Sequence, residues 1–182
     1  NPGVGYGGSC FPKDVKALIA TAEQRGYDAR LFKEVDALNE RQKKTMIHKI
    51  NKVFNHDLAG KTFTILGLAF KPKTSDMREA PSVVIINDLL AAGAKINAYD
   101  PAAAEEARKV FGTTITYCES IVDAVKGSSG MVVVTEWDEF RSINFAELGK
   151  EMHTKIIFDG RNIYEPELVG EEGFAYVGMG RK

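Results

Sequence analysis

The sequence predicts an α/β protein in which a long helical segment is followed by a doubly wound parallel sheet. Apolar residues recur at helical spacing from residue 12 to about residue 55, and beyond residue 60 short β-branched runs alternate with helical segments. Strands that alternate with helices favour a parallel sheet covered on both faces. We therefore expect two parts: residues 1–58, a glycine-rich loop with a helical linker, and residues 59–182, a Rossmann-like domain.

The helical segment is expected to contain two helices. Its pattern breaks at residues 25–28, and the first helix should begin near residues 11–13, where Pro12 suits a first turn. The second part, residues 29–54, reads as one amphipathic helix of about 25 residues or as two shorter helices. An apolar stripe of that length needs a partner, either elsewhere in this chain or in another chain.

Six strands and four further helices complete the predicted domain. The strands are expected at residues 62–66, 95–99, 114–117, 131–135, 155–158 and 174–177. The helices are expected at residues 82–92, 102–111, 120–124 and 145–151. Ligands of doubly wound sheets bind beyond the carboxyl ends of the strands. Residues 70–71, 135–137 and 159–161 are therefore candidate positions for a site.

The chain opens with a glycine-rich stretch that leads to a cysteine. Residues 1–14 read Asn-Pro-Gly-Val-Gly-Tyr-Gly-Gly-Ser-Cys-Phe-Pro-Lys-Asp. Glycines let a loop wrap closely around a ligand, and Cys10 stands where the first helix begins. Free amides and the positive end of the helix dipole at that point favour a thiolate, and Lys13 adds a cation. A reactive Cys10 is one interpretation, and a glycine-rich turn with a buried, inert cysteine is the other.

The loop after the first expected strand differs from a dinucleotide-binding loop. It reads Gly67-Leu-Ala-Phe-Lys-Pro, where dinucleotide binding would require Gly-x-Gly-x-x-Gly. Because Phe70 and Lys71 would obstruct a pyrophosphate, we expect this domain to bind something other than NAD along the loop. Asp100, at the end of the second strand, is interpreted as a turn former, and Trp137 as a packing residue.

Composition limits the classes of function. The net charge of −1, with both signs scattered along the chain, gives no basic face for nucleic acid or for an anionic membrane. The sequence shows no apolar run of membrane-spanning length and no signal segment, so we expect a cytoplasmic protein. The three histidines and two cysteines show no metal-ligand spacing, and no metal site is predicted.

Three stretches of the sequence match motifs of one known family. The first is Gly5-x-Gly-Gly-x-Cys-x-x-Lys-Asp14, the second runs from Gly67 to Ser82, and the third, a weaker match, is Phe-Asp-Gly-Arg-Asn at residues 158–162. The chain thereby resembles the nucleotide-sugar dehydrogenases of the UDP-glucose 6-dehydrogenase family. That family has an N-terminal NAD-binding domain, to which nothing here corresponds. The resemblance therefore implies a C-terminal fragment that lacks this domain, and a homodimer joined through the long helix.

The resemblance also implies a reaction, the oxidation of UDP-glucose to UDP-glucuronate by two hydride transfers to NAD. Cys10 would attack the aldehyde formed by the first transfer and hold the sugar as a thiohemiacetal and then as a thioester. Asp14 would position or activate water. The alternative is that Asp14 only complements the helix dipole from the first turn and has no role in catalysis.

Binding residues follow from the same resemblance. The implied substrate contacts are Asn1, Gly5, Tyr6, Gly7, Phe70, Lys71 and Arg161. The implied cofactor contacts are Lys13 and Arg78. Arg161 could instead be a surface arginine in a turn, and Arg78 could pair with Asp76 or Glu79.

Two other functions fit the same sequence. One is the same reaction on GDP-mannose or UDP-N-acetylmannosamine, because base and sugar specificity depend on a pocket shape that the sequence does not give. The other is a non-catalytic module that binds a sugar nucleotide. The lack of a cofactor domain favours such a module, whereas the set of Cys10, Lys13 and Asp14 opposes it.

Overall fold

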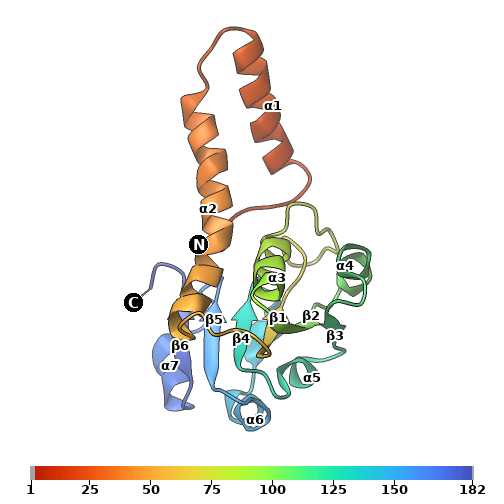
Figure 1. The fold of residues 1–182 in the computed structure, drawn as a ribbon, viewed down its shortest axis with the longest axis vertical. Helices are drawn as coiled ribbons and strands as arrows, with labels where there is room; N and C mark the ends of the chain where they lie inside the picture. Colours follow the sequence, from red (N-terminus) through yellow and green to blue (C-terminus); the bar gives the residue numbers. More distant parts are fainter. Residues whose placement is uncertain (1–2, 182) are drawn as a thin grey trace.

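The computed structural model describes residues 3–181, and a helical hairpin projects from its α/β domain (Figure 1). Helices α1 (Phe11–Gln24) and α2 (Arg30–Val53) lie side by side and antiparallel. Between them Gly26 has a φ of +76°, a left-handed conformation that glycine adopts without strain. The two predicted helices are confirmed, and the second is one continuous helix of 24 residues.

Six parallel strands form one sheet in the order β3-β2-β1-β4-β5-β6. Their bounds are β1 Thr62–Leu66, β2 Lys95–Tyr99, β3 Thr116–Tyr117, β4 Gly130–Val133, β5 Ile156–Asp159 and β6 Ala175–Gly178. The chain runs outward from β1 to β3 on one side and from β4 to β6 on the other. The predicted doubly wound sheet is confirmed, and its switch point lies at the carboxyl ends of β1 and β4.

Helices cover both faces of this sheet. They are α3 Pro81–Ala91, α4 Ala104–Phe111, α5 Ile121–Val125, α6 Phe145–Glu151 and α7 Pro166–Glu171, with a 3₁₀ helix η1 at Asp138–Ser142. One core joins the sheet to α2, α3 and α4 and includes Ile50 and Ile85. The other joins it to α5, α6 and α7 and includes Leu148 and Val169. Alternate strand residues therefore serve two separate cores, as expected for a parallel sheet buried on both faces.

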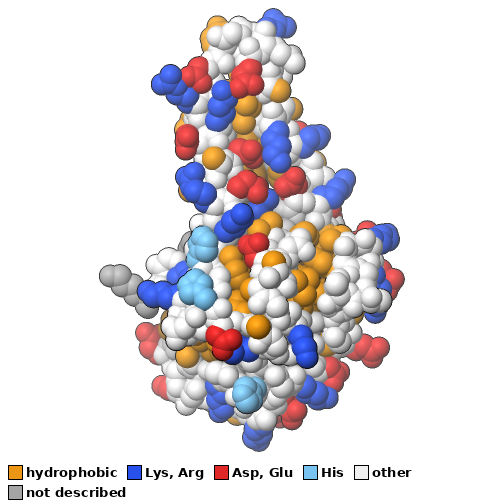
Figure 2. All heavy atoms as spheres, viewed as in Figure 1, with side chains coloured by type: hydrophobic (Ala, Val, Ile, Leu, Met, Phe, Trp, Pro, Cys, Tyr) orange, Lys and Arg blue, Asp and Glu red, His pale blue; other side chains and the backbone are white. Residues whose placement is uncertain are grey.

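Helix α2 contributes to both the domain and the hairpin. In its second half Met46, Ile47 and Ile50 are buried in the domain core. In its first half Leu31 is 72% and Leu38 is 56% exposed, and apolar side chains remain visible along the hairpin (Figure 2). Over residues 3–181 no helix is long and apolar enough to cross a membrane. In its first half α2 packs against α1, and part of its apolar stripe remains exposed.

Some local predictions differ from the structure. The strand expected at 114–117 begins at Thr116, because the Thr114 N–H still donates to the Phe111 carbonyl at the end of α4 (3.0 Å). Helices η1 and α7 were not predicted. Helix α7 is short, and Gly170 within its six residues lowers their helix propensity. The other expected elements are confirmed with small shifts at their ends.

Candidate functional site

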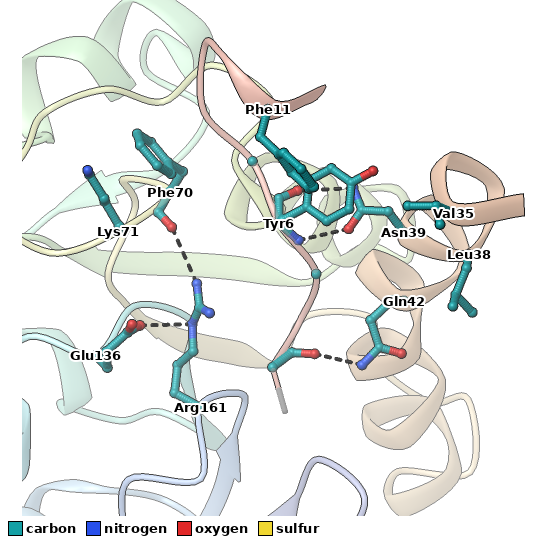
Figure 3. Close-up of a pocket in the computed structure, with 13 residues that line it drawn as sticks. Tyr6, Phe11, Val35, Leu38, Asn39, Gln42, Phe70, Lys71, Glu136 and Arg161 are labelled. Atoms are coloured by element: carbon teal, nitrogen blue, oxygen red, sulfur yellow. Dashed lines mark hydrogen bonds and ion pairs between the residues drawn. The ribbon is translucent and has the colours of Figure 1, made fainter. Parts of the chain in front are cut away.

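A cavity of about 610 Å³ lies between the carboxyl ends of the strands and the base of the helical hairpin (Figure 3). It is lined by Gly3, Gly5, Tyr6, Gly7, Phe11, Val35, Leu38, Asn39, Gln42, Phe70, Lys71, Glu136 and Arg161. Of the residues expected to meet substrate, Gly5, Tyr6, Gly7, Phe70, Lys71 and Arg161 are all in this lining. Asn1 lies outside the described residues. The fold therefore gathers, around one cavity, residues that are far apart in sequence.

The glycine-rich loop is held against α2 by side chains of that helix. The Tyr6 N–H donates to Asn39 Oδ1 (2.7 Å), and Asn39 Nδ2 donates to the Tyr6 carbonyl (3.0 Å). Gln42 Nε2 donates to the Gly3 carbonyl (2.6 Å). Gly5 has a φ of +103°, and a Cβ there would lie 2.9 Å from Asn39 Oδ1, so glycine is required at this close approach. The Tyr6 amide, expected to meet substrate, is already engaged by Asn39 in this conformation.

Arg161 enters the cavity from the loop after β5 and is fixed by backbone carbonyls. Its Nε donates to the Val134 carbonyl (2.7 Å) and its Nη2 to the Phe70 carbonyl (3.3 Å). Nε also lies 3.0 Å from Glu136 Oε2, and the Arg161 side chain is only 17% exposed. Burial lowers the pKa of the Arg161 guanidinium, and the Glu136 carboxylate opposes that shift. The alternative of a surface arginine is therefore wrong.

The turn that presents Arg161 is built on a buried carboxylate. Asp159 Oδ1 accepts the Arg161 N–H (3.0 Å), and Oδ2 accepts the Tyr164 N–H (3.0 Å) and the Tyr176 hydroxyl (3.1 Å). Burial and the nearby Asp159 charge raise the pKa of Tyr176, which keeps its hydroxyl protonated as a donor. These hydrogen bonds to Asp159 fix the backbone of residues 159–161, and the Arg161 guanidinium faces the cavity.

Aromatic rings and an exposed cation provide much of the remaining wall. The Phe70 ring packs on Gly8, where a Cβ would lie 2.8 Å from Cε2. Lys71 is exposed, with its Nζ 5.3 Å from the centre of the Phe70 ring. Tyr6 and Phe11 stack edge to face at 4.6 Å. Such a wall suits a ligand that combines ring systems with negative charge.

The crevice at the ends of β1 and β4 is unsuited to a dinucleotide. Asp100 is buried, and its carboxylate accepts hydrogen bonds from Trp137 Nε1 and from the N–H groups of Leu68, Ala69, Ala102 and Ala103. Asp100 forms the turn that we expected, and it also accepts hydrogen bonds from the N–H groups of the loop after β1. Those amides would be needed for a pyrophosphate. Trp137 packs against the second core, as predicted.

Cys10 is not among the residues that line the large cavity or a second hollow nearby. It is exposed at the start of α1, and its carbonyl accepts the Asp14 N–H (2.8 Å). The next residue, Phe11, lines the large cavity, as does Gly7, three residues before Cys10. The hollow, of about 510 Å³, is lined by Gly8, Ser9, Lys13, Lys16, Arg78 and Glu79. The interpretation of Cys10 as a buried cysteine is therefore wrong, whereas Asp14 lies on the exposed surface 3.4 Å from Lys13 Nζ.

The two expected cofactor residues, Lys13 and Arg78, line the same hollow. Arg78 pairs with Asp76, to which Nε and Nη2 donate at 2.9 and 2.8 Å. Those bonds lower the pKa of the Asp76 carboxyl. Glu79 instead accepts from Lys16 (3.2 Å). The hollow therefore presents three cationic side chains beside the glycine-rich loop.

Sequence reasoning missed several residues of the site. Asn39 and Gln42, which line the cavity from α2, were not expected. A signal was present for these two, because Asn39 and Gln42 are three residues apart on the stripe that continues to Lys43 and Met46. Polar residues on an otherwise buried helical stripe need partners. Glu136, which lines the cavity from the loop after β4, lies in the candidate stretch 135–137, although no role was predicted for it.

Two models of one family match the chain. The UDP-glucose/GDP-mannose dehydrogenase family, UDP binding domain, matches residues 64–166. The central domain of the same family matches residues 1–41. The first match covers most of the sheet and the second covers the loop, α1 and part of α2.

Individual relatives agree with these models. The UDP-glucose 6-dehydrogenase of Pseudomonas aeruginosa is 44% identical in an alignment of 184 positions that covers 98% of this chain and 41% of that protein. The UDP-glucose 6-dehydrogenase YwqF of Bacillus subtilis is 42% identical, over 99% of this chain and 41% of that protein. The solved UDP-glucose dehydrogenase of Pyrobaculum islandicum has a TM-score of 0.84 and 32% identity, over 97% of this chain and 38% of that one. The chain spans about two fifths of the length of these relatives. With a family model matched over more than half of its residues, the chain belongs to the UDP-glucose/GDP-mannose dehydrogenase family.

Proposed function

We propose that this chain is the C-terminal part of an NAD-dependent UDP-glucose 6-dehydrogenase, which oxidises UDP-glucose to UDP-glucuronate. The observation that supports it best is the position of Cys10, which is exposed and directly precedes Phe11, a lining residue of a cavity that suits a sugar nucleotide. Relatives named UDP-glucose 6-dehydrogenase favour this substrate over others of the family. Because the chain spans about two fifths of those relatives, the activity is proposed for a longer protein with an NAD-binding domain.

The sugar nucleotide is proposed to lie in the large cavity. The Lys71 ammonium and the Arg161 guanidinium would pair with its phosphates, since charged donors make the stronger hydrogen bonds to anions. The rings of Tyr6, Phe11 and Phe70 would pack against its base and sugar. The volume of about 610 Å³ falls within the usual range of small-molecule sites, about 300–1,000 Å³.

Cys10 is proposed to hold the sugar between two oxidations. The first oxidation converts the C6 alcohol to an aldehyde, and the Cys10 sulfur then adds to the carbonyl carbon while the oxygen takes up a proton, giving a thiohemiacetal. Loss of a hydride and a proton from the thiohemiacetal leaves a thioester. Water then displaces the sulfur, which releases the carboxylate and restores the thiol; Asp14, one turn further along α1, is proposed to position or activate that water. When bound, NAD⁺ supplies the hydride acceptor for both oxidations.

Two partners are proposed. Because Asp100 occupies the amides of the β1 loop, NAD is assigned to a separate N-terminal domain, with Lys13 and Arg78 meeting its phosphates from this chain. A homodimer through the hairpin would cover the exposed Leu31 and Leu38 side chains. A cytoplasmic setting suits the mechanism, because reducing conditions keep a nucleophilic cysteine as a thiol.

Titration with sugar nucleotides tests the proposed substrate. UDP-glucose is expected to bind at least about tenfold more tightly than GDP-mannose, because a pocket that hydrogen-bonds one base leaves polar groups unpaired with the other. Isothermal calorimetry of the chain with UDP-glucose, UDP-N-acetylmannosamine and GDP-mannose gives the three dissociation constants. A preference for GDP-mannose would contradict the UDP assignment.

Changing Lys71 tests where the phosphates lie. Lys71→Met is expected to weaken UDP-glucose binding about 10- to 100-fold, because one charged hydrogen bond contributes about 1.5–3 kcal/mol. Lys71 is exposed, so the melting temperature should not change. Lys73→Met is the matched control, since Lys73 is also exposed and pairs with Asp138 at 3.6 Å, away from the cavity lining. Equal affinities for the two variants would place the phosphates elsewhere.

A further inference from the structure

The segment just before Cys10 is held by backbone contacts on two sides. Asn39 bonds both the N–H and the carbonyl of Tyr6, which fixes that peptide to α2 (Figure 3). From the other side the Gly8 N–H donates to the Arg78 carbonyl (2.8 Å). The loop is therefore enclosed between α2 and the segment that precedes α3.

A buried lysine connects these two sides. Lys43 of α2 is 2% exposed, and its Nζ lies 2.8 Å from Glu40 Oε1 and 3.2 Å from Glu79 Oε2. The Lys43 side chain packs against Gly5, where an added Cβ would lie 3.2 Å from Lys43 Cγ. Burying an ammonium is costly unless it is paired. The Lys43 side chain thus lies against the loop and forms an ion-pair bridge from α2 to Glu79.

Glu79 is strained at the point where it meets the loop. Its φ of +53° is unfavourable for a residue with a side chain. In this conformation its carbonyl packs on Gly7 so closely that a Cβ there would overlap the oxygen. The Lys43 hydrogen bond lowers the pKa of the Glu79 carboxyl, against the effect of burial. A strained backbone conformation persists only where surrounding contacts hold it. The bond from Lys43 is one contact that holds Glu79 in this conformation.

We infer that Asn39, Lys43 and Glu79 form a clamp that sets the conformation of the loop before Cys10. In the proposed reaction they are positioning residues, because they act on the loop backbone and need not touch the reacting atoms. Their consequence for binding rests on the proposed function. The holding of the loop itself is independent of that function.

Amide hydrogen exchange of the chain tests the clamp directly. Lys43→Met and Glu79→Gln are each expected to speed exchange of the loop amides at residues 5–8 about tenfold, with unchanged protection in β1 and β4. The double variant should exchange no faster than the faster single variant, because both changes remove one bridge. Lys44→Met, at an exposed position next to Lys43, is the matched control and should leave the loop unchanged.

Two results would overturn the clamp. Loop exchange at the wild-type rate in both single variants would show that the bridge holds nothing. Loop exchange that rises only in step with β1 and β4 would show a general loss of stability. If Lys43→Met does not fold, hydrogen exchange of Glu79→Gln still decides the result, because a change at the partly exposed Glu79 side chain should leave the fold intact.

Ligand affinity links the clamp to the site. In Lys43→Met the affinity for UDP-glucose is expected to fall about tenfold at a nearly unchanged melting temperature, since a loosened loop must be ordered again on binding. Unchanged affinity with a loosened loop would remove its role in binding. If the wild-type chain itself does not bind UDP-glucose, the proposed function fails, and hydrogen exchange still decides the clamp.

Discussion

Replacing Gly67 with alanine is expected to lower the free energy of unfolding by about 2–6 kcal/mol. Gly67 has a φ of +91°, and an added Cβ would overlap Thr135 Cβ and lie 2.7 Å from the Thr135 backbone nitrogen. Backbone strain at such a φ costs about 1–3 kcal/mol, and overpacking adds about 1–3 kcal/mol. Relief would require β1 and β4 to separate beside the Val134 N–H bond to the Leu66 carbonyl (2.9 Å). Urea unfolding followed by circular dichroism measures the loss.

Gly60→Ala is the matched control for this prediction. Gly60 precedes β1 and has a φ of +74°, but nothing lies within 4 Å of its added Cβ. It should therefore lose about 1–2 kcal/mol, the cost of a left-handed conformation alone. Equal losses at Gly60 and Gly67 would mean that the close contact with Thr135 relaxes without cost.

The arrangement of helices and strands was accessible from the sequence because its signals are local. Helical spacing continues across α2, and β-branched runs mark the strands. Helix α7 was not predicted because Gly170 lowers the helix propensity of its six residues. The start of β3 depended on the Thr114 N–H closing the turn after α4, a bond that the strand propensity of threonine does not reveal.

The site was accessible from two signals, the carboxyl ends of the expected strands and the family motifs. Phe70, Lys71 and Arg161 were expected from such motifs, and the fold places them around one cavity. The role of Asp100 was missed, because its five donors come from three separate segments that only the sheet brings together. Lys43 was missed for a similar reason, since its burial depends on Glu79. Contacts between distant segments carry no local pattern that a single sequence could show.

The proposed chemistry predicts a large loss of activity when Cys10 is changed in the longer protein that includes the NAD-binding domain. Cys10→Ser should lower the rate of UDP-glucuronate formation about 10³-fold or more, because a serine hydroxyl is a far weaker nucleophile and the thioester cannot form. Stability should change by less than about 0.5 kcal/mol, since Cys10 is exposed. NADH absorbance and mass spectrometry of the product follow the reaction, and the present chain alone is expected to form no NADH.

The other cysteine separates a specific role of Cys10 from a general effect of losing a thiol. Cys118 follows β3, partly buried, and burial raises the pKa of its thiol, so at neutral pH it stays protonated and a poor nucleophile. Cys118→Ser should therefore form UDP-glucuronate at the wild-type rate, and alkylating reagents should modify Cys10 before Cys118. Undiminished acid formation by Cys10→Ser would remove the thiol from the mechanism. In that case the exposure of Cys10 beside the cavity would need another explanation, and a sugar-nucleotide-binding module without its own nucleophile would become the better account of the chain.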